Sequence, residues 1–173
     1  MTFTTDSAQN RFANAFNYSQ PLTDAVTSTT AVFKSLSVDD QLAVLWFTYT
    51  EMGRSITPAA TGVARLQLAE GLLNQIKQMS HEQQLQVMRD LAASKNTPIS
   101  RSYGILSTNT KLAFWYELSE LMTQGLVVPV PPNYQLSRDG FQVLETLKKL
   151  DFGQQITVLR KVVTDMGIDP FGR

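Results

Sequence analysis

The stretch Asp40–Gly53, DQLAVLWFTYTEMG, carries the strongest structural signal in the chain. Leu42, Trp46 and Tyr49 follow one another at spacings of four and three residues, which places them on one face of an α-helix. Apolar residues also occupy the other faces of this stretch. A helix that is apolar nearly all round must be buried on several sides, so we expect the helix from Val38 to Met52 at the centre of a helical protein.

A second helix of the same character is expected from Asn109 to Gln124. A helix with two apolar stripes must pack between two groups of helices or cover a ligand. One stripe contains Phe114, Leu118 and Leu121, and the other contains Leu112, Trp115, Ser119 and Met122.

Start signals divide the rest of the chain into further helices. Ser37, Ser80 and Asp151 each begin a capping-box pattern, in which two side chains satisfy backbone N–H groups at the start of a helix. Strand signals are nearly absent, and the one extended stretch, Leu126–Val130, contains proline, which argues against a central strand. We therefore predict an all-α protein of eight or nine helices, the first at about residues 7–18.

The sequence also contains an internal echo. QLAVL at Gln41–Leu45 is matched by QITVL at Gln155–Leu159 and, in part, by QLQVM at Gln84–Met88. Two interpretations are open. Amphipathic helices share patterns by coincidence, or two similar helical halves pack together along a shared seam.

Composition excludes several classes of function. The 173 residues contain no cysteine and one histidine, His81, which excludes disulfides, thiol nucleophiles and zinc sites that need a pair of histidines. The net charge of zero gives no reason to expect a nucleic-acid partner. The longest apolar run, Leu42–Tyr49, is far shorter than the roughly 20 residues of a spanning helix. We expect a soluble, cytoplasmic monomer without a membrane span.

Catalytic motifs are missing as well. Glu117 and Glu120 could form a carboxylate pair, but their spacing also suits an exposed polar face, and no glycine-rich phosphate loop or activated serine is present. We predict no catalytic residue, no metal and no enzyme activity.

The aromatic and methionine residues allow two interpretations. Trp46, Tyr49, Trp115 and Tyr116 are either ordinary core aromatics or a pair of clamps on an apolar ligand. Methionines at apolar helical positions either fill gaps in the core or line a channel for a polyene, because methionine contacts π systems well. These methionines are Met52, Met88, Met122 and Met166.

Three long motifs, found in order, resemble the orange carotenoid protein family, and the resemblance covers nearly the whole chain. They are Asp40–Gly53; Lys111–Leu118 with the following Gln124–Pro131; and Gly153–Gly167. The resemblance implies an all-α fold of two interleaved four-helix bundles around a central carotenoid tunnel, with residues 1–173 forming one carotenoid-binding domain of the N-terminal type.

The resemblance also implies the ligand and its contacts. The ligand is one ketocarotenoid of the canthaxanthin, echinenone or 3′-hydroxyechinenone type. The implied contacts are Leu42, Trp46, Tyr49, Met88, Leu112, Trp115, Tyr116, Met122, Val130, Pro131, Tyr134, Thr157 and Met166.

The family's photoreceptors continue into a C-terminal domain, whereas this chain stops at Arg173, so we expect a stand-alone helical carotenoid protein. Arg160 matches an arginine that bridges the two domains and then contacts the phycobilisome. Here we expect Arg160 to be free or paired with a carboxylate such as Asp165. The implied function is photoprotection by quenching singlet oxygen. The alternatives are a quencher that docks on thylakoid-associated phycobilisomes and a carrier that passes carotenoid to a separate C-terminal-domain homologue.

Overall fold

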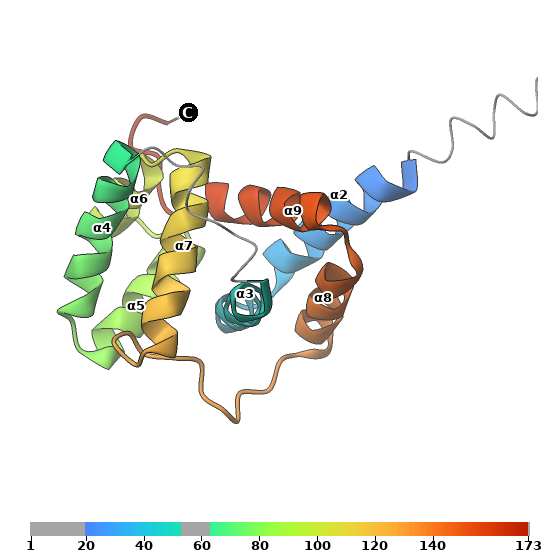
Figure 1. Ribbon diagram of the computed structural model, residues 1–173, viewed down its shortest axis with the longest axis horizontal. Helices are drawn as coiled ribbons and strands as arrows, with labels where there is room; N and C mark the ends of the chain where they lie inside the picture. The colour runs from blue at the N-terminus through green and yellow to red at the C-terminus, as the bar shows by residue number, and fades with distance from the viewer. Residues whose placement is uncertain (1–19, 53–62, 173) are drawn as a thin grey trace, which may run out of the picture.

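The computed structural model describes residues 20–52 and 63–172, and all regular elements in this part of the chain are helices (Figure 1). The predicted all-α class is therefore confirmed. The helix predicted at residues 7–18 and the predicted helix end at Gly53 lie outside the described residues. The helices are α2 (Gln20–Ser35), α3 (Val38–Met52), α4 (Val63–Lys77), α5 (His81–Ala92), α6 (Pro98–Gly104), α7 (Thr108–Thr123), α8 (Arg138–Lys149) and α9 (Phe152–Thr164).

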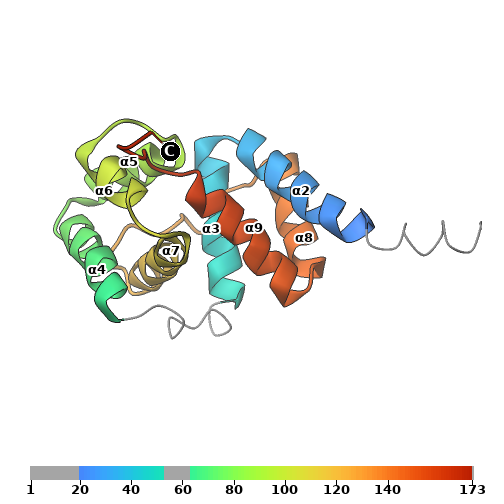
Figure 2. The same cartoon turned by 90° about the horizontal axis from the view of Figure 1, so that it is seen from above.

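The helices form two groups of four that lie side by side (Figure 2). The first bundle contains α2, α3, α8 and α9, and the second bundle contains α4 to α7. The bundles meet where α7 packs on α9 and α3, and where α3 packs on α5. The second bundle is inserted in sequence between the two halves of the first, so the expected pair of interleaved four-helix bundles is confirmed.

Local sequence signals explain most helix starts. The capping boxes that begin at Ser80 and Asp151 are both complete. Ser37 caps α3, because its hydroxyl accepts from the backbone N–H of Asp40 at 3.2 Å. The second half of that box is different: the Asp40 carboxylate accepts from Tyr134 and Ser137 instead of turning back to Ser37. The capping-box prediction at Ser37 was therefore half right.

The internal echo in the sequence corresponds to a repeated contact. Gln41, Gln84 and Gln155 each lie four residues after the cap of their helix. Each side-chain amide donates to a carbonyl near the end of the preceding helix, where carbonyls lack partners within the helix. The echo thus marks the hairpins α2–α3, α4–α5 and α8–α9. The acceptors are the carbonyl oxygens of Leu36 at 3.1 Å, Ile76 at 3.0 Å and Leu147 at 2.9 Å.

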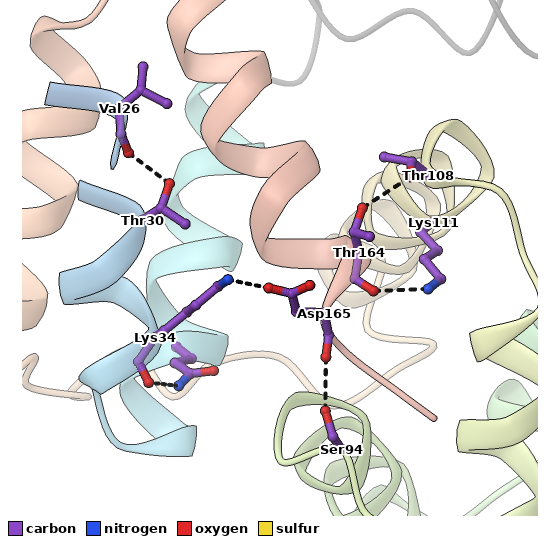
Figure 3. Close-up of polar contacts among 9 residues, drawn as sticks. Val26, Thr30, Lys34, Ser94, Thr108, Lys111, Thr164 and Asp165 are labelled. Carbon is purple, nitrogen blue, oxygen red and sulfur yellow. Dashed lines mark hydrogen bonds and ion pairs between the residues drawn. The ribbon is translucent and has the colours of Figure 1, made fainter. Parts of the chain in front are cut away.

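The end of α9 joins the two bundles (Figure 3). Lys34 of α2 forms an ion pair with Asp165 on the side of the first bundle. From the second bundle, the Ser94 hydroxyl donates to the Asp165 carbonyl at 2.9 Å, and the Lys111 ammonium donates to the Thr164 carbonyl at 3.0 Å. The first bundle thus holds the Asp165 side chain while the second bundle satisfies the Thr164 and Asp165 carbonyls, so this helix end fixes one bundle against the other.

The chain after α9 remains attached to the second bundle. The backbone N–H of Gly167 donates to the Leu91 carbonyl at 2.9 Å, and the backbone N–H of Ile168 donates to the Ser100 carbonyl at 3.0 Å. Here α6 and the tail approach so closely that a Cβ added at Gly104 would lie 1.8 Å from the Ile168 carbonyl oxygen. Glycine at position 104 is therefore a requirement of this contact.

Candidate functional site

A cavity of about 250 Å³ opens where the two bundles meet. Its walls are α3, α5, α7 and residues 128–134, which we call the wall segment and which belongs to the connection that runs from α7 to α8 (Figure 1). The lining is Asp39, Leu42, Ala43, Leu45, Trp46, Tyr49, Leu85, Met88, Arg89, Trp115, Ser119, Met122, Val128, Pro129, Val130, Pro131 and Tyr134.

Helical periodicity explains why these side chains converge. On α3, Leu42, Trp46 and Tyr49 share one face, and on α7 Trp115 and Met122 share another. Both helices are buried at the boundary between the bundles, so these two faces meet across the cavity instead of facing solvent. Tyr49, Trp115 and Met122 are all buried, which makes the interior of the cavity apolar.

The polar groups of the buried aromatic residues Tyr49 and Trp115 form hydrogen bonds within the protein. The Tyr49 hydroxyl donates to the Leu112 carbonyl at 3.1 Å, and burial raises the pKa of Tyr49 well above its usual value. The Trp115 indole N–H donates to the Tyr103 hydroxyl at 3.0 Å, which donates in turn to the Val163 carbonyl at 2.6 Å. Since these polar groups are paired, the rings can present apolar surface to a ligand without leaving donors unsatisfied.

Two polar side chains hold the wall segment in place at its two ends. At the first end, the Gln84 side chain donates to the Leu126 carbonyl at 3.1 Å and accepts from the Val128 N–H at 2.9 Å. At the other end lies Asp40, a buried carboxylate. Burial alone would raise the pKa of Asp40, but hydrogen bonds from Ser137 and Tyr134 outweigh it and lower the pKa. The wall of the cavity is therefore anchored to α5 and α3.

Nine of the thirteen residues that the resemblance implied as carotenoid contacts line this cavity. They are Leu42, Trp46, Tyr49, Met88, Trp115, Met122, Val130, Pro131 and Tyr134.

The other four lie elsewhere. Leu112 is buried and provides the carbonyl that holds Tyr49, and the Tyr116 ring lies 6.4 Å from the Tyr49 ring, centroid to centroid. Met166 is buried just after α9. Thr157 is exposed on α9, and its hydroxyl donates to the Gly153 carbonyl at 2.8 Å.

Arg160 is exposed on α9, beside a shallow depression that Lys34, Lys161 and Asp165 also line. Asp165, the partner suggested by the sequence, pairs with Lys34 instead (Figure 3). Within the described ranges Arg160 makes no hydrogen bond or ion pair.

Eight lining residues were not predicted from the sequence, and helical spacing could have suggested some of them. Leu85 lies three residues before Met88, Ser119 four after Trp115, and Asp39 three before Leu42. The full set is Asp39, Ala43, Leu45, Leu85, Arg89, Ser119, Val128 and Pro129.

The chemistry of the lining fits an apolar, π-rich ligand. Aromatic, aliphatic and thioether groups form most of it, and only Asp39 and Arg89 are charged. Over residues 20–52 and 63–172, no group of acidic, histidine or cysteine side chains is placed to hold a metal ion. Nor is any described helix long and apolar enough to cross a membrane.

Comparison with known proteins gives a consistent result. A sequence profile described as "Orange carotenoid protein, N-terminal" matches residues 19–169. An orange carotenoid-binding domain-containing protein of Nostoc sp. PCC 7120 is 76% identical over 170 residues, which are 98% of each chain. The orange carotenoid-binding protein of Limnospira maxima is 50% identical over 98% of this chain, which is 52% of the relative. The chain thus spans about half the length of that relative.

Solved structures agree in fold. The Anabaena (Nostoc) sp. PCC 7120 Orange Carotenoid Protein binding canthaxanthin has a TM-score of 0.78 and 57% identity, over 85% of this chain and 48% of that one. The Red Carotenoid Protein of the same organism, also binding canthaxanthin, has a TM-score of 0.71 and 45% identity, over 82% of this chain and 97% of that one. From the helical fold, the profile match over most of its length and these relatives, it follows that the chain belongs to the orange carotenoid protein N-terminal family.

Proposed function

We propose that this protein binds one ketocarotenoid in the cavity between α3, α5, α7 and the wall segment, and that the complex protects against light damage by quenching singlet oxygen. The observation that carries the proposal is the lining itself. Buried aromatic rings, whose hydroxyl and indole N–H groups are already hydrogen-bonded, face an apolar space that lies between two bundles. In this proposal residues 1–173 act as one carotenoid-binding domain and catalyse no reaction.

The nine lining residues named above are proposed to contact the pigment directly. The other four residues lie outside the lining, so we propose that they contact a part of the pigment that extends beyond it. Leu112 and Tyr116, which flank Tyr49, and Met166 and Thr157, near or on α9, are proposed contacts for that part.

The protein's own contribution is to keep an apolar rod out of water and to hold it still. Each square ångström of apolar surface removed from water stabilises the complex by about 25 cal/mol. The conversion of excitation into heat is the chemistry of the pigment when it is bound. The residues of the chain determine its environment, and the anchors at Gln84 and Asp40 keep the wall segment in position against it.

A second candidate function is docking on the phycobilisome, where the complex would quench excitation. The observation that favours it is the exposed Arg160 beside Lys34 and Lys161. A third candidate is the transfer of carotenoid to a separate C-terminal-domain homologue, favoured by the partial exposure of the wall segment. Fluorescence of isolated phycobilisomes mixed with holoprotein tests the second candidate, and pigment transfer to that apo-homologue tests the third.

The first experiment is the visible absorption spectrum of the protein purified from cells that make ketocarotenoids. A structured or red-shifted carotenoid band that co-elutes with the protein supports the proposal. A colourless, folded, helical protein would contradict it. Singlet-oxygen lifetimes measured with the pigmented and colourless protein then test the quenching role.

A further inference from the structure

One ion pair interrupts the apolar lining of the cavity. Arg89 of α5 donates to Asp39 of α3 through two bonds, from Nε to Oδ1 at 2.8 Å and from Nη2 to Oδ2 at 3.0 Å. The two side chains are 40% and 44% exposed, whereas Tyr49 and Trp115 are buried. The pair therefore lies where the cavity opens to solvent, and its two residues come from two of the helices that form the walls.

Arg89 keeps unused hydrogen-bond donors at this position. A guanidinium carries five N–H groups in a fixed fork, and Asp39 accepts from two of them. In the part of the chain that the structure describes, the other three N–H groups have no hydrogen-bond partner. The hydrogen bond that Arg89 donates to Asp39 also raises the pKa of Arg89, so the donor set stays charged.

The other polar groups of the lining are engaged or neutral. The Tyr49 hydroxyl donates to the Leu112 carbonyl, and the Trp115 indole N–H donates to the Tyr103 hydroxyl. The Tyr134 hydroxyl donates to the Asp40 carboxylate. Trp46 and Ser119 offer one neutral donor each. Arg89 is thus the single cationic donor among the described lining residues.

The end ring of a carotenoid is either a hydrocarbon or carries oxygen, and the two kinds of ring meet this pair differently. A hydrocarbon ring at the opening displaces water from the guanidinium and returns no hydrogen bond, which is unfavourable. A ring carbonyl has only acceptor lone pairs, and Arg89 has only donors to offer. A site with such donors discriminates against the ligand that lacks the matching oxygen.

We propose that Arg89, held in place by Asp39, is a specificity-determining residue that selects carotenoids with a carbonyl oxygen on the end ring at this opening. The inference rests on the proposed function, since it concerns the ligand of the same cavity, and it names the residue that distinguishes a ketocarotenoid from a hydrocarbon carotene.

The test is competitive loading of the full chain. Apoprotein is incubated with equal amounts of canthaxanthin and β-carotene, and the bound pigments are extracted and quantified by chromatography. We expect the wild type to favour canthaxanthin and Arg89→Met to reduce that preference about tenfold, the value of one hydrogen bond to a charged group. Arg89→Lys, which retains a cationic donor, should restore most of the preference.

Arg101→Met is the matched control. It removes another exposed arginine, which bonds to Asn96 and does not line the cavity, and it should leave the preference unchanged. Arg89→Met with normal total pigment and an unchanged ratio would overturn this inference alone. A wild type that takes up neither pigment would overturn the inference together with the proposed function. Far-UV circular dichroism identifies a variant that has failed to fold, and in that case Arg89→Gln takes the place of Arg89→Met: it keeps a polar side chain but removes the cation, so the preference should still fall, and an unchanged ratio would overturn the inference.

Discussion

The hydroxyl of Tyr134 donates a 2.7 Å hydrogen bond to the carboxylate of Asp40, which lies 94 positions earlier in the chain. This bond ties the wall segment to the first turn of α3. Asp40 is buried, and its other oxygen accepts from the Ser137 N–H at 3.1 Å. The position of the wall segment therefore depends on one carboxylate, which accepts its hydrogen bonds from residues outside its own helix.

Tyr134→Phe should destabilise the protein. The variant leaves a buried carboxylate short of one donor, which costs about 1–3 kcal/mol of unfolding free energy. Urea denaturation followed by circular dichroism measures the change. Tyr116→Phe is the control, because the Tyr116 hydroxyl makes no hydrogen bond with the described residues, and its effect should stay within about 0.5 kcal/mol.

The same substitution predicts a dependence on alkaline pH. Burial and the bond to Asp40 raise the pKa of Tyr134 to about 12, above the value near 10 in the unfolded chain. The stability contributed by the protonated phenol is therefore fully present below about pH 10 and is lost as the pH rises towards 12. The difference in unfolding free energy between wild type and Tyr134→Phe should shrink over that window. A difference that stays constant to pH 12 would contradict the assignment.

The three glutamines of the internal echo should differ in importance. Gln84→Leu removes three hydrogen bonds to the backbone, Gln41→Leu two and Gln155→Leu one. Each lost hydrogen bond costs about 0.5–1.5 kcal/mol, so the loss of stability should follow that order and reach about 3 kcal/mol for Gln84→Leu. Thermal and urea unfolding measure the series. Exposed Gln86, whose amide bonds to the Asp90 side chain and to no backbone group of the described residues, gives the matched control Gln86→Leu, and an effect as large as that of Gln84→Leu would refute the explanation.

Two glycine substitutions should have opposite effects. A methyl group at Gly104 would collide with the Ile168 backbone, so Gly104→Ala should cost at least about 3 kcal/mol and release the tail from α6. Gly71, in the middle of α4, has nothing within 4 Å of an added Cβ, so Gly71→Ala should stabilise the protein by about 0.4–1 kcal/mol. Hydrogen exchange at Gly167 and Ile168 reports the tail contact directly, and normal protection there in Gly104→Ala would argue against the collision.

Pigment loading should depend on the two tryptophans in different ways. Trp46 is only partly buried and has no hydrogen bond with the described residues, so Trp46→Ala should lower loading while the apoprotein stays folded. Trp115→Ala should also lower loading, but it should cost about 3–5 kcal/mol as well because that indole is buried and bonds to Tyr103. The ratio of visible to ultraviolet absorbance of the purified protein measures loading. Phe141→Ala, which removes an exposed ring outside the cavity, should load normally, and normal loading in both tryptophan variants would exclude the clamp role.

Much of the fold follows from local signals in the sequence. Capping at Ser80 and Asp151, the left-handed conformations of Gly125 and Gly167, and the apolar spacing of α3 all concern residues within a few positions of one another. Periodicity also showed that Leu42, Trp46 and Tyr49 share a face. These features are set by helix geometry, which a sequence displays directly.

What periodicity does not show is which faces oppose one another across space. Asp40 looked like part of a local capping box, yet its partner Tyr134 lies in a distant segment. Arg89 carries no site signal in the sequence, and its place in the lining depends on α5 packing against α3. Such pairings come from tertiary packing, for which spacing within one helix carries no information.

The insertion of one bundle between the halves of the other affects the order of events during synthesis. Helices α4 to α7 are consecutive, so their mutual contacts can form as soon as that part of the chain has left the ribosome. Helices α2 and α3 emerge earlier but must wait for α8 and α9 before their own bundle can close. Because α3 is apolar nearly all round, the nascent chain exposes an apolar, aggregation-prone surface during that interval. We expect α3 to pack on α5 and α7 during that interval, and these contacts, which later border the cavity, would then cover part of the surface and protect the unfinished protein from aggregation.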